Sequence, residues 1–237
     1  MMIHFIEAYT IPESWVKLID LCLKFGRVYR IDRGSNVGHK RKELDCITVL
    51  IKMPWQRPLT YHDDGIEYAP STQEIYNYFY KFIVPEKIRI ECYDYTYAER
   101  IASHDQLNKV IDMLAETPHT NQAVIRITQP SDIDLGAPPC MLFIQFKVIE
   151  GKLVAYTFFR SWDLLSGYPY NIPAIQLLKE YVLDEVNMIR EKRGLNKFSD
   201  GELVAFSSGL HLYDYQWDIA HVIVQRTLYK SRKSNSK

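Results

Sequence analysis

Residues 141–159 contain two apolar, β-branched runs separated by a short turn signal, a pattern that predicts a β-hairpin. Met141–Ile149 and Leu153–Phe159 flank Glu150-Gly151-Lys152, and glycine suits the left-handed backbone of a tight hairpin turn. Cys140 directly precedes the first run. We therefore expect a cysteine at the mouth of a strand, where a sheet fixes its backbone and the preceding loop stays open to a ligand.

The residues around this hairpin carry chemistry that suits a pyrimidine nucleotide. A thiolate such as that of Cys140 is a strong nucleophile. The guanidinium of Arg160 can bind phosphate through a fork of N–H groups. The amide of Asn171 offers both a donor and an acceptor to the edge of a base. A lone cysteine before an apolar strand is usually a small buried hydrophobe, but Pro138-Pro139 before it and the Arg160–Asn171 block after it favour a nucleophile.

Composition and cysteine usage narrow the functional class. The 29 basic and 29 acidic residues among 237 leave no net charge, which argues against a dedicated nucleic-acid or membrane-surface protein. No apolar run is long enough to span a bilayer, and Met1–Phe5 shows no signal peptide. Cys22, Cys46, Cys92 and Cys140 are far apart, so neither a disulfide framework nor a metal site is expected. We expect a cytoplasmic protein.

The chain is expected to form one domain over residues 1–230, followed by a flexible basic tail at 231–237. Thr10 is a candidate helix cap, with Glu13 three residues later. Apolar periodicity predicts the remaining elements. Besides the hairpin, they are helices at 11–25, 72–83, 173–193 and 215–229, and strands at 44–52, 123–128 and 203–207.

The ordered motifs resemble those of the thymidylate synthase family, in its short archaeal-type form. They are Gly136-Ala137-Pro138-Pro139-Cys140, Gln145-Phe146, Gly151-Lys152-Leu153, Arg160–Asn171, His211-Leu212-Tyr213 and, near the N-terminus, Asp32-Arg33-Gly34-Ser35. The resemblance implies an α/β (α+β) fold with a mixed sheet. Helices would pack on one face of that sheet, and its other face would form a homodimer.

The resemblance also implies a reaction, the methylation of dUMP to dTMP. Cys140 would add to C6 of uracil, so that C5 becomes a carbon nucleophile. The carbon and hydride would come from 5,10-methylene-tetrahydrofolate or from a modified archaeal tetrahydropterin. Two alternatives remain open. One is a dUMP hydroxymethylase, in which water instead of hydride captures the methylene intermediate, and the other is a nucleotide-binding relative without turnover.

The family's functional residues map onto specific positions of this chain. Asn171 would read uracil rather than cytosine, Glu74 would manage protons near O4, and Tyr97 would lie near the C5 proton. Glu74 could equally be a surface residue of its helix. The implied set comprises catalytic Cys140, Glu74 and Tyr97; nucleotide-binding Arg33, Arg160, Ser161, Asp163, Gly167, Asn171, His211 and Tyr213; and pterin-binding Asp163, Gly167 and Tyr170.

One departure from the family pattern affects phosphate binding. The family sends two adjacent arginines to the phosphate of the partner subunit, and Asn121 and Gln122 occupy those positions here. Arg33 and Arg160 would then hold the phosphate nearly alone. The basic cluster His39-Lys40-Arg41-Lys42 could compensate, although a solvated charged turn is the simpler interpretation.

Overall fold

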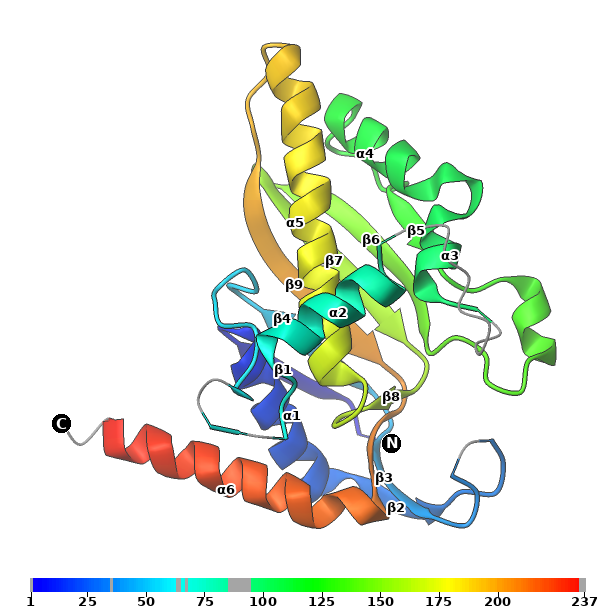
Figure 1. Ribbon diagram of the computed structural model, residues 1–237, viewed down its shortest axis with the longest axis vertical. Helices are drawn as coiled ribbons and strands as arrows, with labels where there is room; N and C mark the ends of the chain where they lie inside the picture. Colours follow the sequence, from blue (N-terminus) through cyan, green and yellow to red (C-terminus); the bar gives the residue numbers. More distant parts are fainter. Residues whose placement is uncertain (1, 35, 63–64, 67, 85–94, 235–237) are drawn as a thin grey trace.

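A computed structural model describes residues 2–34, 36–62, 65–66, 68–84 and 95–234. Two mixed β-sheets and the helices packed against them form the fold (Figure 1). The larger sheet has the order β1-β4-β9-β7-β6-β5 and the smaller one β2-β3-β10-β8. The elements are β1 His4–Ala8, α1 Ile11–Phe25, β2 Arg27–Arg30, β3 Lys40–Leu44, β4 Ile47–Ile51, α2 Thr72–Phe82, α3 Tyr97–Ala102, α4 Gln106–Glu116, β5 Val124–Arg126, β6 Met141–Ile149, β7 Lys152–Phe159, β8 Trp162–Asp163, α5 Tyr168–Lys192, β9 Ser199–Ser207, β10 Leu210–Tyr213 and α6 Trp217–Ser234.

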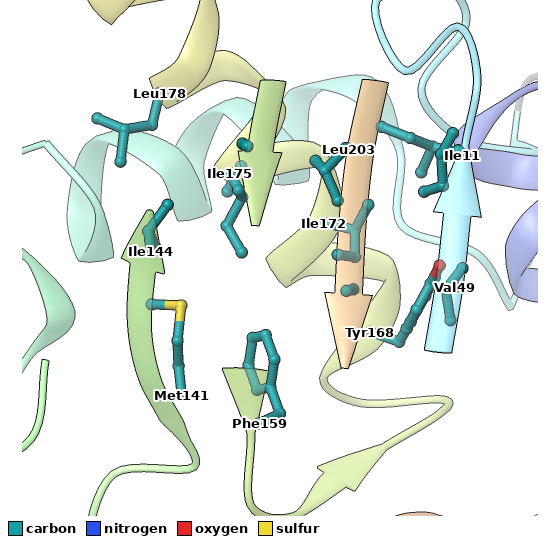
Figure 2. Close-up of a cluster of buried hydrophobic side chains, with 14 of the residues drawn as sticks. Ile11, Val49, Met141, Ile144, Phe159, Tyr168, Ile172, Ile175, Leu178 and Leu203 are labelled. Atoms are coloured by element: carbon teal, nitrogen blue, oxygen red, sulfur yellow. The ribbon is translucent and has the colours of Figure 1, made fainter. Parts of the chain in front are cut away.

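The core lies between α5 and the six-stranded sheet. Ile172 and Ile175 of α5 are fully buried and lie over apolar side chains of the sheet, among them Phe159 and Leu203 (Figure 2). Each such apolar side chain stabilises the fold by about 1.5–3 kcal/mol. The expected mixed α/β architecture is confirmed.

The elements with local sequence signals form as predicted. The Thr10 hydroxyl accepts a hydrogen bond from the backbone N–H of Glu13 at 3.3 Å and begins α1. In the β6–β7 hairpin, Ile149 pairs with Lys152. Its two turn residues, Glu150 and Gly151, have φ values of 49° and 76°, the left-handed pair that a tight hairpin requires.

Several boundaries differ from the prediction. Strand β9 begins at Ser199 instead of Leu203, and β5 is shorter than the predicted strand at 123–128. Helix α5 begins at Tyr168 instead of Pro173, so Asn171 lies inside its first turns. The strand predicted at 44–52 is divided, because Leu44 ends β3 in one sheet and β4 begins at Ile47 in the other. Helix α6 continues to Ser234, beyond the predicted start of the tail. None of the helices within the described ranges combines the length and apolarity that a membrane crossing requires.

Candidate active site

Cys140 lies in the bend that immediately precedes β6, as the sequence predicted. Its carbonyl accepts a hydrogen bond from the backbone N–H of Arg160 at 2.9 Å, which joins the cysteine to the end of β7. Burial raises the pKa of its thiol, while the positive charges of Arg160 and Arg41 partly offset that rise. The arginines therefore favour the thiolate as expected, but burial outweighs them in the free protein.

Arg160 holds the loop that carries the cysteine. Its Nε donates to the carbonyl of Pro139 at 2.9 Å, and its Nη2 donates to the carbonyl of Pro138 at 2.6 Å. The same Nη2 lies 3.8 Å from the Cys140 sulfur. The guanidinium thus fixes the loop and places a positive charge beside the sulfur, and the half-buried Ser161 follows it in the chain.

Asn171 is 8% exposed, and its amide is held by two neighbours. The indole Nε1 of Trp162 donates to Asn171 Oδ1 at 2.9 Å, and Asn171 Nδ2 donates to the hydroxyl of Tyr78 at 2.7 Å. A β-carbon on Gly167 would lie 3.4 Å from Asn171 Oδ1 and 3.1 Å from the carbonyl of Asp163. The tighter of the two contacts is with the Asp163 carbonyl, so a side chain at position 167 would press on the backbone of β8.

Asp163 stabilises the turn between β8 and α5. Its Oδ1 accepts from the backbone N–H groups of Leu165 and Ser166 at 2.7 and 2.9 Å. Gln216 Nε2 donates to the two carboxylate oxygens at 3.2 and 3.1 Å. Tyr170, which is half-buried, is the third residue of α5 and lies in its first turn. No sequence motif marks Gln216, because it lies 53 residues from Asp163 in the chain.

His211 and Tyr213 lie on one face of β10, with ring centroids 4.9 Å apart. The carbonyl of Gly209 can only accept, so His211 Nδ1 donates to it at 2.8 Å and Nε2 carries a lone pair. Burial, with Arg41, lowers the pKa of His211 to about 4. The ring is neutral at pH 7, and its buried Nε2 has no hydrogen-bond partner among the described residues.

Arg41 is a member of this site that the sequence suggested only as part of a basic cluster. It pairs with Tyr213 across the β3–β10 ladder, and its Nη2 donates to the Tyr213 hydroxyl at 3.1 Å. Its Nη1 lies 3.4 Å from Glu43 Oε2. Its Nε is buried and, within the part of the chain that the structure describes, lacks a partner. The unpaired donor on Arg41 suits a bound acceptor, and the unpaired acceptor on His211 suits a bound hydroxyl.

Tyr97 and Glu74 have different surroundings. Tyr97 is half-buried at the start of α3, and burial, with Tyr78 and Cys140 nearby, holds its pKa well above 10. The Glu74 carboxylate is exposed and accepts from both the backbone N–H and the hydroxyl of Ser71, forming a capping box. From that same helix, Tyr78 rather than Glu74 contacts Asn171. The proton-managing role of Glu74 stays a prediction.

The other predicted residues lie in exposed loops or outside the described ranges. Arg33 is exposed in the loop between β2 and β3, and Asn121 and Gln122 are exposed just before β5. Cys92 lies outside the described residues. Within the described ranges, no group of three or more His, Cys, Asp or Glu side chains could hold a metal ion.

Comparison with known proteins identifies the family. The thymidylate synthase family profile matches residues 67–235, more than half of the chain. A Methanosarcina barkeri protein described as "putative thymidylate synthase" is 27% identical over 225 residues, which cover 93% of this chain and 94% of that protein. Proteins of the same description from Methanosarcina mazei, 28% identical over 93% of this chain and 94% of its own length, and Methanothermobacter marburgensis, 24% identical over 94% and 99%, are also similar. The chain belongs to the thymidylate synthase family.

Proposed function

We propose that this protein methylates dUMP to dTMP through the thiolate of Cys140. The observation that carries the proposal is the 3.8 Å contact between the Cys140 sulfur and Arg160 Nη2. Cys140 is a thiol in the ligand-free protein and would react as a thiolate. The adjacent guanidinium lowers the free energy needed to form that negative charge. In the reaction the sulfur forms a bond to C6 of uracil, and C5 takes up the one-carbon unit and loses its proton. The C6–sulfur bond then breaks, which returns Cys140 as the thiolate.

Side chains around the thiol suit the rest of the nucleotide. Asn171 would pair with the uracil edge, and the neutral His211 would accept a hydrogen bond from the sugar hydroxyl. Tyr213, whose oxygen accepts from Arg41, would donate to the same sugar. Arg160, Ser161 and Arg33 would bind the phosphate. Tyr97 stays protonated because burial raises its pKa, so it would donate a hydrogen bond near C5 and would not act as a free base.

The one-carbon donor is proposed to be 5,10-methylene-tetrahydrofolate or a modified archaeal tetrahydropterin. It supplies both the carbon and the hydride that completes the methyl group. The proposed pterin contacts are Asp163, Gly167 and Tyr170, which lie between the end of β8 and the first turn of α5, close in sequence to Asn171. Gln216 donates a hydrogen bond to the Asp163 carboxylate and so holds it in place. The pterin would donate a hydrogen bond to the same carboxylate.

A second copy of the chain is the proposed partner, packed on the sheet face opposite α5. Phe206 pairs with Phe158, and Phe158 pairs with Phe143, across three neighbouring strands. These half-buried rings continue a row through Thr48 to Phe5, which is 62% exposed. A contiguous apolar row of this size is typical of an interface. Sedimentation of the wild type and of Phe158→Lys tests this; a wild type that is monomeric at micromolar concentration would contradict it.

The reaction is tested by mass spectrometry of the nucleotide after incubation with dUMP and 5,10-methylene-tetrahydrofolate. Gain of CH₂ would identify the methyl product. Gain of CH₂O would identify the alternative hydroxymethylase, in which water captures the intermediate. Binding of dUMP with no change in its mass, in the presence of either type of pterin, would favour a nucleotide-binding relative without turnover.

A further inference from the structure

The amide of Asn171 is held in one orientation by a neighbour that cannot act as an acceptor. We infer that the indole N–H of Trp162 fixes this orientation and thereby makes Trp162 a positioning residue that determines base specificity. The inference rests on the proposed function, in which Asn171 reads the base. It assigns the choice between uracil and cytosine to a pair of residues instead of to Asn171 alone.

The two hydrogen bonds of the amide differ in what they can enforce. An indole N–H is a donor only, so the atom that faces Trp162 Nε1 at 2.9 Å must be the oxygen of Asn171. The Tyr78 hydroxyl lies 2.7 Å from Nδ2, and a hydroxyl is chemically able to donate as well as to accept, so it does not by itself require one orientation. A flipped amide would place two donors face to face in a buried setting, which is costly.

The anchored amide keeps one acceptor and one donor for a ligand. Its carbonyl oxygen has two lone pairs and its nitrogen has two hydrogens, and Trp162 and Tyr78 each engage one. Uracil presents N3–H as a donor and O4 as an acceptor, so it matches the remaining pair. Cytosine presents N3 as an acceptor and its amino group as a donor, so it matches a flipped amide. An asparagine that is free to flip could pair with either base.

The indole itself has no freedom to turn. Trp162 is 2% exposed, and its ring stacks on Phe159 at 3.9 Å with an interplanar angle of 3°. The ring of Tyr168 packs on the indole, with the ring centroids 4.6 Å apart. The backbone N–H of Trp162 donates to the carbonyl of Gly209 at 2.8 Å. This packing holds the N–H on the amide oxygen and makes the orientation a fixed property of the folded chain.

The test is the ratio of dCMP to dUMP dissociation constants, measured by calorimetry on Trp162→Phe. Removing the N–H frees the amide to flip, so the preference for dUMP should fall about tenfold, which corresponds to about 1.4 kcal/mol. A second variant carries benzothienylalanine at position 162, which keeps the ring shape and replaces N–H by sulfur. It provides the answer if Trp162→Phe does not fold. Trp217→Phe is the matched control, because it removes an indole N–H that donates to the carbonyl of Leu212 instead of to Asn171.

The results separate the inference from the function on which it rests. A folded Trp162 variant that keeps the wild-type ratio would overturn the inference, as would a Trp217→Phe variant that lowers the ratio equally. Wild-type protein that binds dUMP with no preference over dCMP would also overturn it, while leaving the methylation of dUMP in place. A wild type that binds neither nucleotide would overturn the proposed function itself.

Discussion

Acidification should destabilise this protein through His211. The ring is 2% exposed, and burial holds its pKa at about 4, below the ordinary value of 6.5. The unfolded chain takes up a proton below pH 6.5, whereas the folded chain does so only near pH 4. The free energy of unfolding therefore decreases as the pH falls from 6.5 to about 4. Above pH 6.5 the neutral ring makes its full contribution to stability.

The size of the effect follows from the width of the window. Each pH unit between the two pKa values costs about 1.4 kcal/mol of folding free energy, so the full window amounts to about 3 kcal/mol. Between pH 7 and pH 5 the expected loss from His211 is about 2 kcal/mol. For a protein of marginal stability this is a large fraction of the total.

Urea denaturation at pH 7 and pH 5 measures this loss. His211→Gln lacks the titrating ring, so its free energy of unfolding should fall about 2 kcal/mol less than that of the wild type between the two pH values. His221→Gln, at an exposed position of α6, should behave like the wild type. If the free energy of unfolding falls equally in the wild type and in His211→Gln, the claim that His211 is buried and neutral is wrong.

Five substitutions test the proposed nucleotide site. Cys140→Ser should lower kcat on the order of 10³-fold or more while dUMP still binds in calorimetry; substantial product would remove the thiol from the mechanism. Asn171→Asp should shift the ratio of kcat/KM values from dUMP toward dCMP, and an unchanged ratio would mean that another residue reads the base. Arg160→Ala should weaken dUMP binding by about 2–5 kcal/mol with little effect on deoxyuridine. If Arg41→Ala also weakens dUMP binding without affecting deoxyuridine and Arg33→Ala does not, the basic cluster binds the phosphate in place of Arg33.

Elements with local signals were predictable from sequence. The Thr10 cap and the Glu150-Gly151 turn act within a few residues, so their patterns are visible in any single sequence. Cys140 at the mouth of β6 follows directly from the hairpin. The family resemblance supplies the proposed roles, and in the structure Arg160 Nη2 lies 3.8 Å from the Cys140 sulfur.

The remaining features depend on contacts between distant parts of the chain. Tyr78 and Asn171 are 93 residues apart, and nothing near either one marks the pair. The division at Leu44 arises because the chain changes sheets there, although the apolar run continues in the sequence. The start of α5 was misplaced because Pro173 suits a first turn, whereas in the structure it lies inside the helix. Tertiary packing overrides the local signal in each case.

The covalent role of Cys140 is tested most directly with dUMP that carries tritium at C5. Transfer of a carbon to C5 replaces that hydrogen, so wild-type protein with 5,10-methylene-tetrahydrofolate should release tritium to water as product forms. Cys140→Ser should release none, and Cys46→Ser, which alters another half-buried cysteine, should match the wild type. Tritium release by Cys140→Ser at the wild-type rate would contradict the proposed mechanism.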